Sequence, residues 1–311
     1  MTQKLPSNAL ELAHLCKRFG NLIAVDDVSF VVPRGQIVGF LGANGAGKTT
    51  TLRMILNIVK PDSGEISVFG KAPEPVSLRQ VGYLPEERGL YRRMRASATI
   101  AYFGSLKGLS RKEANLRARS LLEYFGLASA ARSRIESLSK GMAQKVALIA
   151  AIAHDPDLLI LDEPFSGLDP LNQEILEKLI RDKVQQGKTV LFSTHTMMHA
   201  ERLADRIVII NKGRIRFDGT QREARASLPR RVRIAADTDL GFLRFAQGVT
   251  NATPPSETRA TWDLELAKHA DGRAILAACF ERGVVPDHFE IAEASLHDIF
   301  IALAEQQGIS P

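Results

Sequence analysis

The sequence has few of the features that mark extracellular or membrane-embedded proteins. Among its 311 residues only two are cysteines, Cys16 and Cys279, which lie far apart and have no metal-ligand spacing. We therefore expect two free thiols and a reducing, cytosolic compartment rather than a disulfide framework or a zinc site. No apolar run reaches the roughly 18 residues that a spanning helix requires, and the start lacks the apolar core of a signal peptide. Any work at a membrane would need a partner chain.

Composition narrows the class of protein without indicating an activity. The hydrophobic share of 45% and the charged share of 24% are ordinary for a folded globular protein, and they indicate neither a disordered nor a fibrous class. At 311 residues the chain is long for one domain and suits two. The net charge of +6 and the pI near 9.4 fit an anionic partner, which leaves nucleotide, nucleic acid and an anionic membrane face open.

Strand-like and helix-like segments alternate along most of the chain, which predicts an α/β fold. Residues 9–19 and 23–32 have the apolar pattern of two strands joined by a turn, and we expect them to pair antiparallel. A short apolar run at 36–41 precedes a glycine-rich turn and the helical pattern of 48–59. The alternation continues with an expected strand at 157–164, a helix at 173–184, a strand at 189–195 and a hairpin at 206–219 that turns at Lys212 and Gly213.

Two further regions depart from this alternation. Residues 96–123 carry helix formers and no strand-like run, so we expect a helical subdomain over about residues 90–155. A polar and basic stretch then separates the α/β part from a second set of strand and helix patterns. We assign residues 1–219 to one domain and 220–311 to a second, small α/β domain, whose last helix begins after Ser295 as its N-cap.

The segment "GANGAGKTT" fits the phosphate-binding pattern G-x-x-x-x-G-K-[ST] and lies between an expected strand and an expected helix. Its glycines allow the backbone to fold around phosphates, so that amide N–H groups and the positive helix end face the anion. The lysine would reach the terminal phosphates, and the threonine that follows it would bind magnesium. The residues that we expect to contact the nucleotide here are Gly42, Asn44, Gly45, Gly47, Lys48, Thr49 and Thr50.

Two later strands end in residues that could act on a nucleotide. Asp162 and Glu163 follow the apolar run "LLIL", at the carboxyl edge of the expected sheet, where α/β proteins bind ligands. Asp162 suits a magnesium ligand, and Glu163 suits a general base that polarises the attacking water. His195 follows the strand "TVLFST", where its imidazole would hydrogen-bond the γ-phosphate. Alone, each of these would be an ordinary surface or structural residue, but together with the glycine loop they predict a nucleotide-hydrolysing site. The remaining histidines considered, which we interpret as structural, are His14, His154 and His199.

One further motif makes a family resemblance specific. The segment "LSKGMAQKV", residues 138–146, resembles the LSGGQ signature of the ATP-binding subunits of ABC transporters. The resemblance implies that Ser139 and the amide of Gly141 contact the γ-phosphate of ATP held by a second subunit, so that ATP is enclosed between two copies. A serine that caps an amphipathic helix explains the same residues, and the two interpretations agree because the cap and the anion site share one helix N-terminus.

Two shorter segments extend the resemblance. The segment "SGLD", residues 166–169, is similar to the loop that crosses the dimer in this family, which implies that Asp169 lies near the nucleotide. The segment "KRFG" places Phe19 where the family stacks an aromatic ring on adenine. Ordinary core packing is the alternative for a phenylalanine near a strand end.

The chain departs from the family pattern at two places. Lys140 and Met142 replace the first glycine and the glutamine of the signature, which puts a contact with the ribose of the facing ATP in doubt. In "GYLPEERGLY", residues 82–91, Glu86 stands where the family has a glutamine, in the loop that links the magnesium site to the membrane partner. We expect Glu86 to contact the metal or nucleotide, or to pair with Arg88; a solvated charged turn is the alternative.

The resemblance covers residues 8 to about 219 and implies a P-loop NTPase of the ABC type with an antiparallel β subdomain and a helical subdomain. The segment "FEIAEASLHDIFIAL" is similar to the accessory domain of subunits associated with drug, antibiotic or sodium export. The implied ligands are ATP and Mg²⁺. The implied partners are a separate transmembrane permease subunit and either an identical or a related ATPase subunit, at the cytoplasmic face of the cell membrane.

Two other functions compete with ATP-driven export. ABC-type ATPases also act on nucleic acid or the ribosome, but such proteins carry two ATP modules, long coiled coils or zinc modules, and this sequence shows none of these; we expect no nucleic-acid partner. A purely structural nucleotide-binding subunit would not need both Glu163 and His195. The transported substrate is not visible, because its site would lie in the membrane partner.

Overall fold

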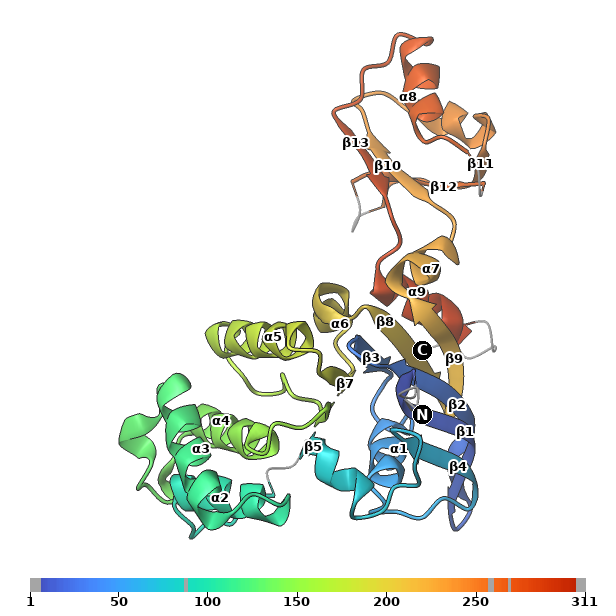
Figure 1. Ribbon diagram of the computed structural model, residues 1–311. Coiled ribbons are helices and arrows are strands. Elements are labelled where there is room, and N and C mark those ends of the chain that lie inside the picture. Colours follow the sequence, from blue (N-terminus) through green and yellow to red (C-terminus); the bar gives the residue numbers. More distant parts are fainter. Residues whose placement is uncertain (1–6, 87–88, 257–259, 268–269, 306–311) are drawn as a thin grey trace. The chain divides into compact units, whose positions relative to one another are not determined.

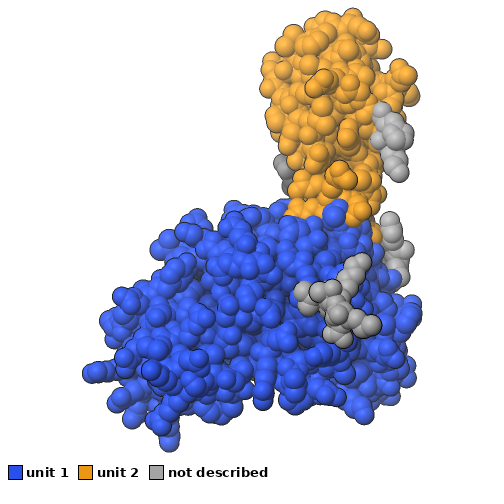
Figure 2. All heavy atoms as spheres, viewed as in Figure 1, with its two compact units in different colours: residues 1–220 blue, residues 221–311 orange. Residues whose placement is uncertain are grey.

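The structure is a computed structural model that describes residues 7–86, 89–256, 260–267 and 270–305. The chain forms two compact units, residues 1–220 and residues 221–311, which Figure 2 colours separately. We name them unit 1 and unit 2. No helix within the described ranges is long and apolar enough to cross a membrane.

A six-stranded sheet forms the centre of unit 1, and its adjacent strands are parallel except for the last pair. The central strands are buried along their whole length, which is why they read as continuous apolar runs in the sequence. In this arrangement the carboxyl ends of three neighbouring strands meet at one edge of the sheet. In spatial order the strands are β5 (Val81–Leu84), β6 (Leu158–Asp162), β7 (Thr189–Thr194), β3 (Ile37–Leu41), β8 (Arg206–Asn211) and β9 (Arg214–Thr220).

The hairpin between β8 and β9 turns at the expected residues. Lys212 and Gly213 have φ values of 50° and 77°, so both lie in the left-handed region. A two-residue hairpin of this kind needs positive φ at both positions, and glycine adopts it without strain. The sequence prediction of this turn is confirmed.

A second, three-stranded sheet packs against the six-stranded one through a shared apolar core (Figure 1). It contains β2 (Leu22–Pro33), β1 (Asn8–Phe19) and β4 (Ser63–Val68), and β1 pairs antiparallel with both neighbours. Helix α1 (Lys48–Ile55) contributes its buried face to the same core. Helices α5 (Pro170–Gln185) and α6 (Met197–Leu203) pack on β7 and β3.

Three helices that pack on one another form the helical part of unit 1: α2 (Ala96–Leu106), α3 (Arg111–Tyr124) and α4 (Lys140–Ile152). Helix α3 begins with a capping box, in which the Ser110 hydroxyl accepts from the Glu113 amide and the Glu113 carboxylate accepts from the Ser110 amide. Helix α4 is buried over most of its length, because residues 146–153 are apolar on every side.

Unit 2 contains an antiparallel sheet with its own apolar core. The last helix begins as expected, since the Ser295 hydroxyl accepts from the Asp298 amide at 3.1 Å. The core is closed by α8, and α7 packs on α9. The elements are α7 (Gln221–Ala226), β10 (Arg231–Ala235), β11 (Val249–Thr253), β12 (Trp262–Leu266), α8 (Arg273–Phe280), β13 (His288–Ala292) and α9 (Leu296–Glu305).

Two strands form that the sequence pattern did not predict. Both β4 and β11 lie at the edge of their sheets, and most of their residues are at least partly exposed. An exposed edge strand needs no alternation of apolar and polar residues, so the period-2 signal is absent from its sequence. The expected mixed α/β fold itself is confirmed.

Candidate functional site

The glycine-rich segment forms a loop from the end of β3 to the start of α1, and its shape depends on two glycines. A Cβ atom on Gly42 would lie 2.6 Å from the carbonyl oxygen of Ile210, which leaves no room for a side chain. Gly47 has a φ of 107°, and a Cβ there would lie 2.5 Å from the carbonyl oxygen of Ala24. Only glycine fits both positions, and the loop therefore brings its backbone close to the helix N-terminus.

Lys48, the first residue of α1, is only 6% exposed and turns its ammonium group back into the loop. Its Nζ donates to the carbonyl oxygens of Gly42 at 2.7 Å and Ala43 at 3.3 Å. Asn44 and Gly45 lie exposed at the tip of the loop. The other two expected nucleotide contacts, which are half-buried in the first turn of α1, are Thr49 and Thr50.

The acid pair at the end of β6 lies beside this loop. Glu163 is 6% exposed, and its two carboxylate oxygens face different partners. Oε1 is 3.3 Å from Lys48 Nζ, and Oε2 is 3.0 Å from His195 Nδ1. His195 is half exposed, so its ring joins the buried carboxylate to the surface. Thus the structure brings together residues from the loop, from β6 and from the end of β7 that the sequence predicted separately.

A serine that the sequence analysis did not single out holds this acid pair. Ser193 lies on β7 directly opposite Asp162 in the strand register and is completely buried. Its Oγ donates to Asp162 Oδ1 at 2.5 Å and accepts from the amide of Glu163 at 3.0 Å. The only available signal was a hydroxyl residue inside an apolar strand, and its partner becomes visible once β6 and β7 are paired.

Asp162 meets the requirements for a metal ligand. Burial raises the pKa of its carboxyl group, while the hydrogen bond from the Ser193 hydroxyl and the nearby Thr49 hydroxyl act in the opposite direction. Its Oδ2 atom is buried and has no hydrogen-bond partner among the described residues. A buried carboxylate oxygen without a partner, beside a threonine hydroxyl, fits the hard oxygen ligands that Mg²⁺ prefers. We refer to Lys48, Thr49, Asp162, Glu163 and His195 as the phosphate-site group.

The signature segment belongs to a second group of residues. Ser139 caps α4, and its hydroxyl accepts from the amide of Met142 at 3.3 Å. Asp169 caps α5 and accepts from the amide of Asn172 at 2.9 Å. The two caps are neighbours, because a Cβ on Gly141 would lie 3.7 Å from the side-chain nitrogen of Asn172.

Lys140 extends this second group across the loop that precedes α5. A Cβ on Gly167 would lie 2.8 Å from Lys140 Nζ, so the lysine side chain lies directly over that glycine. Gly167 has a φ of 69°, which also favours glycine. Lys140 is exposed at the first turn of α4, where the helix dipole already favours an anion. We refer to Ser139, Lys140, Gly141, Gly167 and Asp169 as the signature group.

Phe19 and Glu86 lie outside both groups. Phe19 ends β1 and is 50% exposed, with Lys17 Nζ 5.5 Å from its ring centre, so its ring is not packed in the core. Glu86 is exposed in the loop that follows β5. The pKa of Tyr83 is raised to about 12 by burial and further by the nearby carboxylates of Asp162 and Glu86, so both acids lie within electrostatic reach of one ring. Glu87 and Arg88 fall outside the described residues.

An apolar groove of about 340 Å³ begins at the same loop and runs between α2 and α4. Its lining includes Pro85, Leu90, Phe103 and Leu106, and Ile58 is 62% exposed at its side. Its low polarity affects two basic residues in its wall: burial lowers the pKa of His154 to about 4 and also lowers the pKa of Lys107. The groove is therefore a surface on which apolar side chains of another chain could be buried.

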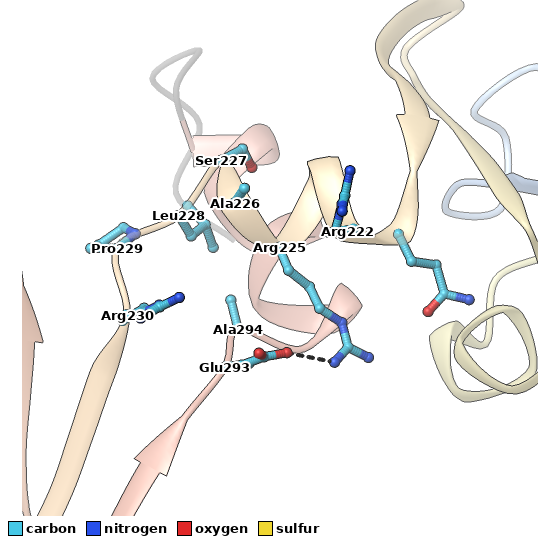
Figure 3. A pocket seen from close by; sticks show the side chains of 10 residues that line it. Arg222, Arg225, Ala226, Ser227, Leu228, Pro229, Arg230, Glu293 and Ala294 are labelled. Atoms are coloured by element: carbon cyan, nitrogen blue, oxygen red, sulfur yellow. Dashed lines mark hydrogen bonds and ion pairs between the residues drawn. The ribbon is translucent and has the colours of Figure 1, made fainter. Parts of the chain in front are cut away.

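Unit 2 has a larger cavity, of about 830 Å³, lined by α7 and the two segments that connect the helices to the sheet. Figure 3 shows Arg225 paired with Glu293, and Arg222 and Arg230 among the other side chains that line the cavity. None of the residues that the sequence predicted to bind nucleotide lines it. Although larger, this cavity lacks the buried acids and the glycine loop of the phosphate site, so size alone does not identify the chemistry.

Known proteins resemble the chain in both sequence and structure. Residues 25–166 match the protein family described as ABC transporter. The chain is 40% identical over 293 residues to the uncharacterized ABC transporter ATP-binding protein YhaQ of Bacillus subtilis, covering 94% of this chain and 97% of that protein. It is 38% identical over 214 residues to the Nod factor export ATP-binding protein I of Burkholderia lata, covering 68% of this chain and 70% of that protein. A solved ATP-binding subunit of an ABC transporter is similar with a TM-score of 0.66 and 36% identity, over 70% of this chain and 92% of that one.

Proposed function

We propose that the phosphate-site group is where this chain, which belongs to the ATP-binding subunits of ABC transporters, hydrolyses the ATP that powers transport. The observation that carries the proposal is the position of Glu163, buried between Lys48 and His195 at 3.3 and 3.0 Å. No observation favours a nucleic-acid or ribosomal role.

Each residue of the group then has a role that its contacts support. The loop amides and the ammonium group of Lys48 would hold the phosphates, since the cation already lies among the loop carbonyls. Thr49 and Asp162 would hold Mg²⁺, which when bound neutralises charge on the phosphates. Glu163 would accept a proton from the attacking water, and His195 would orient the γ-phosphate beside it.

Replacement of Glu163 by glutamine tests this assignment. Glu163→Gln keeps the size of the side chain and removes the base, so ATP binding should persist while turnover falls at least roughly 100-fold. Equilibrium binding of fluorescent ATP and release of phosphate measure the two quantities on the full chain. Glu174→Gln, an exposed acid on α5, is the matched control and should leave both unchanged. Robust hydrolysis by Glu163→Gln would overturn the assignment.

The signature group points to a second subunit. Ser139, Gly141 and Asp169 lie at two adjoining helix N-termini, and exposed Lys140 adds positive charge there. We propose that this group faces the γ-phosphate held by another copy, so that the working form is a homodimer with two sites. The Phe19 ring, exposed at the end of β1, would stack on the adenine.

We propose the apolar groove between α2 and α4 as the surface that docks a helix of the membrane-spanning permease. Pro85, beside Glu86, is part of its lining, so a helix seated there would contact the loop that carries Glu86. Docking would hold the chain at the cytoplasmic face of the membrane. The Nod factor relative is named for export, and we propose that direction of transport for this chain also.

We propose that unit 2 regulates the ATPase or contributes to contact between subunits. The match to YhaQ covers 94% of the chain and therefore includes residues of both units, which supports a shared role for unit 2. Truncation of the full chain after Thr220, with ATPase activity and coupled transport as readouts, tests this role. Unchanged activity and transport would contradict it.

A further inference from the structure

Ser193 connects the two adjacent acids of the phosphate-site group. It lies two residues before His195, on β7, with none of its surface exposed. In the register of β6 and β7 it is the direct partner of Asp162. One oxygen atom, Ser193 Oγ, is within hydrogen-bond distance of both Asp162 Oδ1, at 2.5 Å, and the Glu163 amide, at 3.0 Å.

The direction of these hydrogen bonds follows from the donor inventory. A serine hydroxyl has one hydrogen, and an ionised carboxylate and an amide N–H can respectively only accept and only donate. Ser193 must therefore donate to Asp162 Oδ1 and accept from Glu163 N. Because Oδ1 is engaged in this way, the unpartnered Oδ2 is the carboxylate oxygen left for a metal.

The bond to the Glu163 amide supports an unusual backbone conformation. Glu163 has a φ of 46°, in the left-handed region that non-glycine residues rarely adopt. Such a conformation persists only where surrounding contacts determine it. Two hydrogen bonds are such contacts. The Glu163 amide donates to Ser193 Oγ, and the Ser166 amide donates to the Glu163 carbonyl oxygen at 3.1 Å, which closes a turn. They orient the Glu163 carboxylate towards Lys48 and His195.

An ordinary buried serine satisfies its hydroxyl on whatever backbone group lies nearby. Thr189, at the opposite end of β7, illustrates this, because its hydroxyl accepts from the backbone amide of Gly35 at 3.0 Å. Ser193 differs in its partners, which are the proposed metal ligand and the backbone of the proposed base. Loss of its hydroxyl should therefore affect metal binding and catalysis, whereas loss of the Thr189 hydroxyl should affect only stability.

We infer that Ser193 is a positioning residue that sets the orientation of the Asp162 carboxylate for the divalent metal and of Glu163 for the attacking water. This inference rests on the proposed function of the phosphate-site group. Because Ser193 is fully buried and acts through the two acids, the inference predicts weaker metal binding and slower turnover, with metal-free binding of nucleotide unchanged.

Metal affinity provides the direct test on the full chain. Binding of Mn²⁺, measured by electron paramagnetic resonance with a saturating non-hydrolysable ATP analogue, should weaken roughly tenfold in Ser193→Ala. Binding of the analogue in the presence of a chelator should be unchanged. Thr189→Ala is the matched control, since it removes a buried hydroxyl from the same strand and should leave Mn²⁺ affinity at the wild-type value.

Two further measurements complete the test. Ser193→Thr keeps the hydroxyl and should bind Mn²⁺ more tightly than Ser193→Ala. In the wild-type chain the Glu163 amide should exchange slowly with deuterium, which keeps the inference testable even where Ser193→Ala does not fold. Wild-type Mn²⁺ affinity and turnover in folded Ser193→Ala, or fast exchange of the Glu163 amide, would overturn it. A wild-type chain that neither binds Mn²⁺ with nucleotide nor hydrolyses ATP would instead contradict the proposed function itself.

Discussion

The phosphate-site group and the signature group differ in how their polar residues are satisfied. In the first, Lys48, Asp162 and Glu163 are buried, and each is in contact with another member of the group or with the buried Ser193 beside it. In the second, Ser139 and Asp169 serve as helix caps, and Lys140 has no ion-pair partner within the described part of the chain.

This difference indicates that the two groups differ in how closely their function is coupled to folding stability. A set of buried charges is stable only when its members compensate one another, so function and folding stability are coupled in the phosphate-site group. The exposed signature group can change its charge at little cost to the fold, which suits a surface that meets another molecule. Substitutions in the phosphate-site group should therefore lower both function and stability, whereas substitutions in the signature group should change function with little change in stability.

Lys48→Ala should have the largest effect and should lower both function and stability. It removes a cation that is in contact with Glu163 at 3.3 Å, with both side chains 6% exposed. Affinity for ATP should fall about 100-fold, and the free energy of unfolding should fall by roughly 3 kcal/mol, because a buried carboxylate loses its partner. Titration with fluorescent ATP and denaturant unfolding measure the two effects. Lost ATP binding with wild-type stability would contradict the coupling.

Lys140→Gly, which restores the family residue, should change function with little change in stability. Loss of an exposed cation near the facing phosphates should raise KM for ATP about threefold and reduce its dependence on salt concentration. A glycine in the first turn should cost at most about 1 kcal/mol of stability. Steady-state ATPase assays at several salt concentrations test this, with Lys140→Arg as the charge-preserving control. An unchanged salt dependence would exclude an electrostatic role.

Glu86→Gln should have a smaller effect, limited to the metal. Glu86 follows β5 by two residues, and Leu84 of that strand pairs with Leu161, which precedes Asp162, so the Glu86 charge lies at the same sheet edge as the proposed metal ligand. Removal of that charge should raise the Mg²⁺ concentration for half-maximal ATPase activity about twofold. Unchanged Mg²⁺ dependence together with unchanged coupled transport would identify Glu86 as part of a solvated turn.

His154→Gln should have the smallest effect, which would appear only in acid. In the folded chain the pKa of His154 is about 4, because burial disfavours its charged form, whereas its ordinary value is 6.5. Between these values the unfolded chain binds the extra proton, so stability is present above about pH 6.5 and falls as the pH drops towards 4. After allowance for partial exposure the loss is about 1 kcal/mol. The variant should lose less stability than wild type between these pH values in denaturant unfolding, and an identical loss would contradict the assignment.

The sequence predicted those parts of the molecule whose signal is local. The buried strands β3, β6 and β7 are continuous apolar runs, and the glycine loop between β3 and α1 is a spaced motif. The carboxyl edge where Glu163 and His195 meet follows from parallel pairing, which an alternating α/β pattern implies.

Features that depend on pairing across the fold were not predicted. Ser193 gains its role only when β7 is placed next to β6 in register with Asp162. The Lys140 side chain meets Gly167 only because α4 and the loop before α5 adjoin. The edge strand β4 has too little burial to leave a pattern in the sequence. In each case the information lies in a tertiary contact rather than in neighbouring residues.

The most direct test of the account is whether ATP brings two copies together through the signature group. Glu163→Gln should bind ATP without hydrolysing it, so light scattering of the full-length variant should show a dimer with Mg²⁺ and ATP and a monomer without nucleotide. Addition of Ser139→Arg to the same chain should abolish the dimer, because the bulky cation replaces the small cap at the start of α4. A mass that does not respond to ATP, or a dimer that persists with Ser139→Arg, would contradict the central claim.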